Sequence, residues 1–315
     1  MEETYSSITT PALQFPLISI GLPTYNSYGK ILKALQSIWD QKYPNLEVII
    51  SDNCSTDNTK ELFTTIIHDH PQTIYFRQTA NIGLVQNFEF VLRQSKGEYF
   101  MWIADDDKLE PDILKKYVEF LMSHPEYSLV SGQIKYWRGD KAIFLENNFS
   151  MEDKHRDMRV LHYYYKVMYG AVFHGLMHRC AAEKIPLLNS IGNDFHFVAS
   201  LAYAGKIKQF NYVGYHKQLN GASKNSANYA KAIGASWFSA SFPRISIARD
   251  AFHEILFKSP VYKKRNIPAR FILATVCFAG VLISYYGVKF PFIVAGHLKR
   301  NISKPFNAKF KIKKI

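Results

Sequence analysis

The sequence predicts an α/β fold, a three-layer α/β/α sandwich in which a mainly parallel sheet carries helices on both faces. From about residue 16, short apolar runs alternate with segments of helical periodicity, an order typical of βαβ units. The apolar runs are rich in β-branched residues, as expected of strands buried on both faces. With 315 residues, 47% of them hydrophobic, the chain can bury one large core and still carry an appendage.

The first βαβ unit is predicted from two apolar runs and the helical pattern between them. Residues 17–22 form the first strand, which ends in the breaker-rich loop Pro23 to Asn26. Between 31 and 39, apolar residues recur at the 3.6-residue period of a helix. Residues 46–50 form the second strand, and the polar residues 51–57 that follow can cap the next helix.

The next units repeat this order. A short strand at 74–76 leads to Asn81 and Gly83, after which a helical pattern continues to about residue 94. The apolar run 98–104 is the fourth predicted strand. Pro111 then suits the first turn of another helix, because proline lacks only an N–H that would be unpaired there.

Beyond this helix the pattern weakens: a strand is predicted at 127–134, and no element is assigned between 138 and 165. We divide the chain into four parts, namely an N-terminal extension (1–15), the α/β domain (16–220), its helical C-terminal part (221–254) and a basic, apolar helical segment with a tail (255–315).

The cysteines and the first residues predict a cytoplasmic protein. Cys54, Cys180 and Cys277 are far apart and show no metal-type spacing, which favours a reducing compartment without disulfides or a zinc site. Glu2 and Glu3 stand where a secretory signal would have basic residues, and no continuous apolar run follows them.

The charge distribution argues against a nucleic-acid-binding domain. The net charge is +13, but residues 1–254 contain 26 basic and 26 acidic side chains. Residues 255–315 contain 13 basic residues and no acidic one. The excess therefore belongs to the C-terminal segment, and we expect no nucleic-acid partner for the neutral main domain.

Three consecutive carboxylates, Asp105, Asp106 and Asp107, follow the fourth predicted strand. Adjacent like charges repel by roughly 1 kcal/mol or more even near water, so a cluster at the end of a buried strand needs a cation. Ligands of open α/β sheets bind beyond the carboxyl ends of the strands, and hard oxygen ligands suit Mg²⁺ or Mn²⁺ carrying a phosphate. The alternative is a solvated acidic turn.

Asp52 follows the second predicted strand, so in a parallel sheet it lies at the same edge as the three aspartates. A single carboxylate there can accept a hydrogen bond from the imide of uracil or from a ribose hydroxyl, while the aspartates hold the metal of a diphosphate. A capping or turn residue is the alternative for Asp52 alone.

Four ordered motifs resemble the family 2 glycosyltransferases of the GT-A fold, and they lie at Ile18 to Asn26, Val48 to Asp57, Asn81 to Gly83, and Gly97 to Asp107 with Pro111. The resemblance covers roughly residues 16–220. It implies inverting transfer from a nucleotide-diphosphate sugar, such as a UDP-sugar, with Mn²⁺ or Mg²⁺ as cofactor. The expected acceptor is a carbohydrate or a lipid-linked sugar of cell-surface polysaccharide or glycolipid biosynthesis.

The same resemblance implies the donor and metal residues. Expected contacts to the nucleotide sugar come from Pro23, Thr24, Tyr25, Asn26, Asp52, Asn53, Asn81, Gly83, Asp105, Asp106 and His216. His216 lies in a late segment of the family where basic groups approach the diphosphate. The expected metal ligands are Asp105, Asp106 and Asp107; Asp105 and Asp107 form a literal DxD, whereas the distance to Pro111 favours Asp106.

An inverting transfer needs a general base for the acceptor hydroxyl. The segment Ile191 to Phe197 resembles the family's Glu-Asp motif at the start of the helix that borders the acceptor site. This correspondence makes Asp194 the candidate catalytic base. Without the resemblance, Asp194 would be an ordinary carboxylate at a helix start, where the helix dipole favours it.

The C-terminal segment predicts membrane association. Phe271 to Val288 are 18 residues without a charge, about 27 Å as a helix, whereas a bilayer core is about 30 Å thick. Spanning would strand the eight basic residues from Lys289 onward on the far side of the membrane, against the positive-inside tendency. We therefore expect an interfacial segment on an anionic surface, the inner face of the plasma membrane. A buried apolar helix with a solvated basic tail is the alternative.

Three other functions remain open from the sequence. A nucleotidyltransferase of similar fold would release pyrophosphate, a nucleic-acid-binding protein would use the basic tail, and a membrane scaffold would keep the fold without activity. The donor sugar, the acceptor and the oligomeric state do not follow from the sequence.

Overall fold

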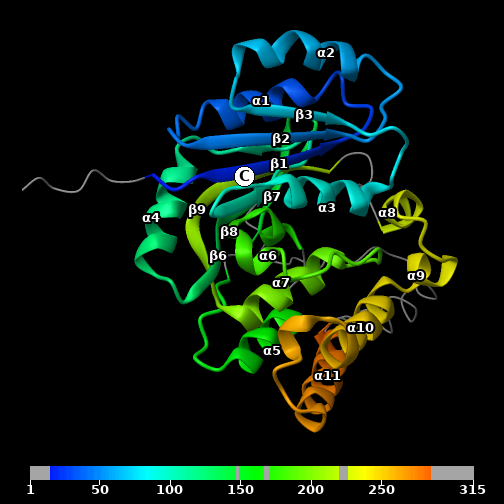
Figure 1. Cartoon of the computed structure of the whole chain (residues 1–315). Helices are drawn as coiled ribbons and strands as arrows, with labels where there is room; N and C mark the ends of the chain where they lie inside the picture. Colours follow the sequence, from blue (N-terminus) through cyan, green and yellow to red (C-terminus); the bar gives the residue numbers. More distant parts are fainter. Residues whose placement is uncertain (1–14, 147–148, 167–169, 220–225, 285–315) are drawn as a thin grey trace, which may run out of the picture.

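The computed structural model contains a sheet of nine described strands with helices on both sides (Figure 1). The structure describes residues 15–146, 149–166, 170–219 and 226–284. Almost all of the predicted N-terminal extension and the basic tail beyond Ser284 lie outside these residues.

Four parallel strands form the first half of the sheet, in the order β3-β2-β1-β4. They are β1 (Ile18–Thr24), β2 (Leu46–Asp52), β3 (Thr73–Arg77) and β4 (Tyr99–Trp102). The four strands expected from the sequence are thus confirmed, with ends that differ by at most two residues. Thr24 is paired in register with Asp52, so the carboxyl ends of β1 and β2 lie side by side.

The second half of the sheet is mixed and continues in the order β4-β8-β6-β9-β5, with β7 paired to β6. The strands are β5 (Lys108–Leu109), β6 (Tyr127–Arg138), β7 (Lys141–Leu145), β8 (Leu176–His178) and β9 (Lys206–Gln218). Only β6 and β9 are parallel neighbours here. The segment 138–165, which the sequence left unassigned, holds β7 and most of helix α5 (Arg156–Lys166).

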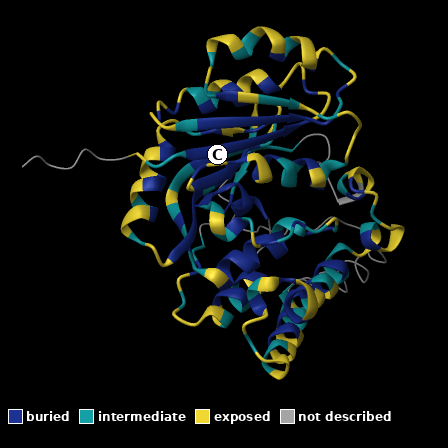
Figure 2. Cartoon of the chain, viewed as in Figure 1, coloured by how far each residue is buried: buried dark blue, intermediate teal, exposed yellow. Residues whose placement is uncertain are grey.

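Alternate residues of the strands form two cores, one on each face of the sheet. One core joins the sheet to α1 (Ile31–Trp39), α2 (Thr59–Ile66) and α4 (Ile113–Ser123). The other joins it to α3 (Leu84–Gln94), α5, α6 (Arg179–Ala182) and α7 (Asn193–Ala204). Figure 2 shows the strands buried between these layers, as a three-layer sandwich requires.

The C-terminal helices extend the second core instead of forming a separate domain. They are α8 (Ser226–Ala232), α9 (Trp237–Ser241), α10 (Pro243–His253) and α11 (Ile267–Leu282). Short 3₁₀ or π turns lie at Ile67–Asp69, Ala171–His174, Glu254–Lys258 and Pro260–Tyr262. Buried residues of α10 and α11 belong to the same core as α5 and α7. No described helix is both long and apolar enough to cross a bilayer.

Helix α7 is anchored at its end by a buried arginine from α5. Arg159 is only 7% exposed, and its Nε and Nη2 donate to the carbonyl oxygens of Ala202 and Tyr203, at 2.6 and 3.3 Å. The last carbonyls of a helix have no partner within the helix, and a cation there also complements the helix dipole. Arg159 therefore fixes the helix whose first turn carries Asp194.

Replacing Arg159 by Met should lower the free energy of unfolding by about 2 kcal/mol or more, because buried carbonyls would lose their donors. Urea unfolding of Arg159→Met against the wild type measures the effect. Arg138→Met, at the exposed end of β6, should be close to neutral. Equal stability of both variants would contradict the anchoring role.

Candidate active site at the carboxyl edge of the sheet

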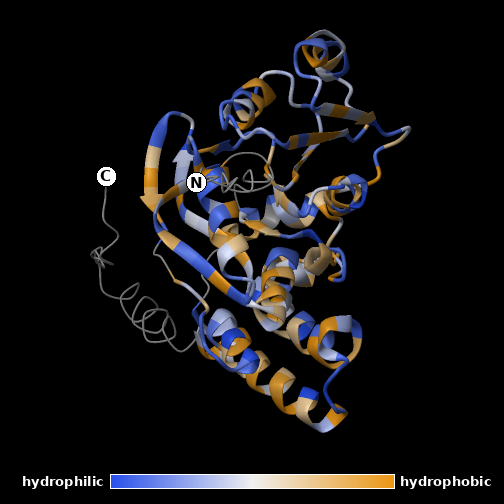
Figure 3. Cartoon of the chain, turned by 60° about the vertical axis from the view of Figure 1, so that its left-hand side comes forward, coloured by the Kyte–Doolittle hydropathy of each residue, from blue (hydrophilic) through white to orange (hydrophobic). Residues whose placement is uncertain are grey.

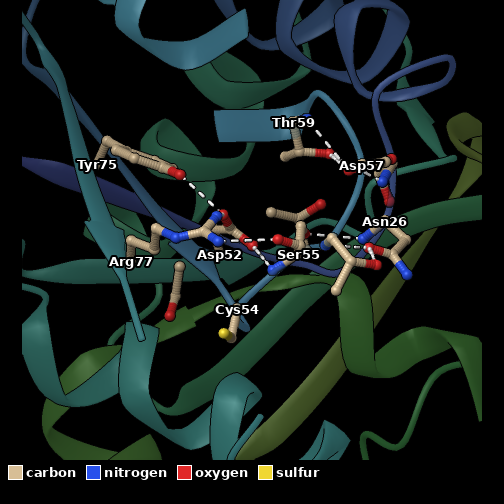
Figure 4. Close-up of polar contacts among 12 residues, drawn as sticks. Asn26, Asp52, Cys54, Ser55, Asp57, Thr59, Tyr75 and Arg77 are labelled. Atoms are coloured by element: carbon tan, nitrogen blue, oxygen red, sulfur yellow. Dashed lines mark hydrogen bonds and ion pairs between the residues drawn. The ribbon is translucent and has the colours of Figure 1, made fainter. Parts of the chain in front are cut away.

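Asp52 organises the end of β2 from a fully buried position (Figure 4). Its Oδ1 accepts the backbone N–H of Ser55 at 2.8 Å. Its Oδ2 accepts the hydroxyl of Tyr75 at 2.8 Å and forms an ion pair with Arg77 at 2.5 Å. Asp52 thus orients the loop and Arg77, and presents no exposed oxygen. A direct contact between Asp52 and a nucleobase stays a prediction.

The loops after β1 and β2 are tied together by side-chain hydrogen bonds (Figure 4). Asn26 has a positive φ of 53°; its Oδ1 accepts the N–H of Thr56 at 2.8 Å, and its own N–H donates to Ser55 Oγ at 2.9 Å. Pro23 and Thr24 are buried, whereas Tyr25 is 45% exposed. Of these loop residues, Tyr25 offers the largest exposed ring to a nucleobase.

Asn53 connects this edge to the turn before α3. Its Nδ2 donates to Asn81 Oδ1 at 3.0 Å and to the carbonyl of Gly83 at 3.2 Å. Its Oδ1 accepts the N–H of Ile82 at 2.8 Å. Gly83 has a φ of 93°, a conformation that side chains rarely adopt. Asn53, Asn81 and Gly83, which were all predicted to contact the donor, therefore form one local hydrogen-bond network. Their polar groups bond mainly to one another.

The three aspartates after β4 have different environments. Thr24 and Ser27 donate their hydroxyls to Asp105 Oδ2. Asp107 is 1% exposed; its oxygens accept the Tyr215 hydroxyl at 2.8 Å and the N–H of Gln218 at 2.7 Å.

Asp106 accepts no hydrogen bond from any described residue, so its carboxylate is the free one of the three. Burial, together with the charges of Asp107 and Asp105, raises its pKa. No group of three or more His, Cys, Asp or Glu side chains in the described ranges is arranged to hold a metal ion. Mg²⁺, however, usually binds through one or two carboxylates plus phosphates and water, and Asp106 suits that kind of site.

Lys217 is a basic side chain that forms an ion pair with one of the aspartates. Its Nζ lies 3.7 Å from Asp107 Oδ2 and 3.2 Å from His174 Nε2. The charge of Lys217 counteracts the rise in the pKa of Asp106 and Asp194. It therefore acts on both the expected metal residues and the expected base.

His216 lies on the opposite face of β9. Its Nε2 is 2.6 Å from Glu110 Oε2, and its Nδ1 accepts the indole N–H of Trp137 at 3.0 Å. Both ring nitrogens thus have partners away from the aspartates. Successive side chains of a strand alternate between its two faces. Lys217 therefore shares a face with Tyr215, which lies beside Asp107, whereas His216 lies on the other face.

Asp194 lies in the first turn of α7, after Gly192 with a φ of 82°. Its Oδ1 accepts the N–H of Phe195 at 3.0 Å, while Oδ2 accepts no hydrogen bond from the described residues. Burial raises the pKa of Asp194, although Lys217 acts in the other direction. A carboxylate with a free oxygen and a raised pKa is suited to accept a proton.

Glu146 is a second buried carboxyl group that the sequence did not single out. It is 8% exposed and follows β7, and the Tyr136 hydroxyl donates to its Oε2 at 3.1 Å. Burial first, and then the charge of Asp194, raise its pKa to about 8. Glu146 is therefore mostly protonated at neutral pH, and no sequence motif marks it.

A mixed sheet of this order, with carboxylates at the ends of β2 and β4 and a further carboxylate at the start of α7, defines a glycosyltransferase of the GT-A fold. Residues 19–185 match the family model "Glycosyl transferase family 2", which is more than half of the chain. The chain belongs to this family, as its motifs suggested.

Named relatives are similar over about a third of the chain. TuaG of Bacillus subtilis, a glycosyltransferase assigned to teichuronic acid biosynthesis, is 32% identical over 109 residues, which are 34% of this chain and 42% of TuaG. A GalNAc(5)-diNAcBac-PP-undecaprenol beta-1,3-glucosyltransferase of Campylobacter jejuni is 35% identical over 95 residues, 30% of this chain and 31% of that enzyme. The chain thus spans about half or less of the length of these curated relatives.

Solved structures share the fold. S. aureus TarS 1–349 in complex with UDP-GlcNAc has a TM-score of 0.61 and 18% identity, over 88% of this chain and 76% of that chain. Mannosyltransferase PcManGT from Pyrobaculum calidifontis in complex with GDP-Man and Mn²⁺ has a TM-score of 0.54 and 16% identity, over 92% and 81%. At these identities the likeness establishes the GT-A fold.

Replacing Asp194 by Asn should stabilise the protein at neutral pH. The pKa of Asp194 is raised in the folded state, so its ionisation opposes folding, and this cost grows as pH rises from the ordinary carboxyl pKa to the raised one. Thermal unfolding at several pH values should show the largest gain for Asp194→Asn above the raised pKa and little gain in acid. A gain that is independent of pH would contradict this assignment.

Proposed function

We propose that this protein transfers a sugar, with inversion, from a nucleoside diphosphate sugar to a hydroxyl group of a carbohydrate or lipid-linked acceptor in cell-surface polysaccharide or glycolipid biosynthesis. The observation that carries the proposal is the arrangement around Lys217, whose charge acts both on the aspartates that follow β4 and on Asp194. Family membership and the UDP-GlcNAc and GDP-Man complexes of the structural neighbours support such a donor.

The groups that bind the donor lie mainly at the ends of β1, β2 and β4. The loop from Pro23 to Asn26 lines the nucleotide, and Lys217 supplies positive charge to the diphosphate. Asp106, which has no hydrogen-bond donor among the described residues, would hold Mn²⁺ or Mg²⁺, with Asp105 and Asp107 beside it. Such an ion, when bound, neutralises charge on the leaving diphosphate.

The group that activates the acceptor lies on α7. Asp194 Oδ2 takes the proton of the acceptor hydroxyl. At the same time, the hydroxyl oxygen attacks the anomeric carbon of the donor sugar on the face opposite the diphosphate. Attack from that face inverts the configuration. The pKa of Asp194, raised by burial, makes the carboxylate a better base near neutral pH than an exposed aspartate.

The purified protein should release a nucleoside diphosphate from UDP- or GDP-sugars in the presence of Mn²⁺ and an acceptor glycan. Asp194→Asn should lower turnover by about two orders of magnitude or more, in line with general-base catalysis, and keep the thermal shift that the nucleotide diphosphate produces. Asp140→Asn, in the exposed turn after β6, is the matched control.

Each alternative outcome has a distinct meaning. Release of pyrophosphate would identify a nucleotidyltransferase. Near-wild-type turnover of Asp194→Asn would remove Asp194 from the mechanism.

We also propose that the C-terminal helices bind an anionic membrane surface. Helix α11 is apolar on both sides: Leu273 and Cys277 are buried, while Phe271 and Ile272 are 51% and 64% exposed. In Figure 3 the C-terminal helices at the bottom carry many hydrophobic residues. A helix that is hydrophobic on all sides is normally buried on all sides, so the exposed side of α11 needs another apolar surface to pack against.

The basic residues around the start of α11 favour a membrane as that apolar surface. Residues 255–270 contain five basic residues and no acidic one, and each basic side chain near anionic lipid contributes on the order of 1 kcal/mol. A bilayer offers both apolar and anionic contacts, and it would bring the enzyme close to a lipid-linked acceptor.

The double variant Ile272→Glu/Val276→Glu should lose most of its binding to vesicles rich in anionic lipid, because two charges would enter the apolar contact. Co-sedimentation at low salt measures this binding. Met122→Glu, an exposed apolar position on α4, should bind like the wild type. Full-length protein that stays in the supernatant would disprove membrane binding.

A further inference from the structure

The carboxylate of Asp194 lies directly against the backbone of Gly170. A Cβ atom built on Gly170 would be 1.9 Å from Asp194 Oδ2 and 2.5 Å from its Cγ. Non-bonded heavy atoms normally lie about 3.5–4 Å apart. The oxygen that faces Gly170 is Oδ2, the one that accepts no hydrogen bond from the described chain.

The backbone of Gly170 does not itself require glycine. Its φ and ψ are −86° and 9°, which residue i+2 of a type I turn adopts with most amino acids. Where φ is positive, as at Gly83, a side chain would strain the backbone, but at Gly170 the three nearest atoms given for the described residues all belong to the Asp194 carboxylate. Glycine at position 170 therefore makes room for Asp194.

Gly170 also begins the 3₁₀ turn that reaches Lys217. Its carbonyl accepts the N–H of Phe173 at 3.0 Å, which closes the turn Ala171–His174. At the other end, His174 is 6% exposed; its Nδ1 lies 3.2 Å from the Trp102 carbonyl, and its Nε2 is beside Lys217. One turn thus contacts both the base and the cation.

We propose that Gly170 is a positioning residue for the catalytic base: the absence of a side chain at this position lets Asp194 Oδ2 point at the acceptor hydroxyl. This inference rests on the proposed role of Asp194. A Cβ at 1.9 Å would force the carboxylate to move by more than 1 Å. Misplacement by about 1 Å can cost about 100-fold in rate.

Gly170→Ala should lower kcat by about 100-fold and leave the KM for the donor and the nucleotide-induced thermal shift unchanged. The effect should depend on the carboxylate, so Gly170→Ala/Asp194→Ala should be no slower than Asp194→Ala alone. Gly280→Ala is the matched control, since a Cβ at Gly280 meets nothing within 4 Å. Near-wild-type turnover of Gly170→Ala would overturn the inference.

Stability gives a second readout if Gly170→Ala folds poorly. The collision predicts that Gly170→Ala lowers the thermal stability much less in the Asp194→Ala background than in the wild type. A double variant that remains as unstable as Gly170→Ala, or that is slower than Asp194→Ala by a further 100-fold, would indicate a purely structural role. A fully active Asp194→Ala would instead reject the proposed base, so the two failures are distinguishable.

Discussion

Burial of several carboxyl groups, together with repulsion among some of them, is the constraint on which the rest of the site depends. Three aspartates follow β4, while Asp194 and Glu146 approach from other elements. Each is stabilised differently: Asp105 by hydroxyl groups, Asp107 by Tyr215 and a backbone N–H, and Glu146 by retaining its proton. Asp106 and Asp194 Oδ2 remain without donors among the described residues, and active sites are where such uncompensated groups are expected.

The mixed second half of the sheet supplies the compensation. Strand β9 runs beside β6 and β5 and brings Tyr215 and Lys217 to the aspartates from more than a hundred residues away in the sequence. The 3₁₀ turn before β8 holds Lys217 through His174. If β9 were absent, the aspartates would lack the ammonium group of Lys217, so a strand of the mixed half completes the site at the end of the parallel half.

The sequence allowed prediction of the features that depend on local pattern. Strands β1 to β4 and helices α1, α3 and α4 follow from periodicity and breakers, and the edge that gathers Asp52 and the aspartates follows from parallel topology. Glu146, Gly170 and Lys217 did not emerge, because their roles arise from contacts between distant segments. The bonds of Asp52 to Tyr75 and Arg77 could not be predicted either, since these side chains come from the neighbouring strand.

The family match covers only part of the proposed site. It ends at residue 185, so it includes the loops proposed to line the nucleotide, the aspartates and Gly170, but neither Asp194 nor Lys217. Gly170 and His174 lie within the matched residues, and their turn contacts both Asp194 and Lys217. One short turn thus joins the matched part of the chain to the proposed catalytic groups beyond it.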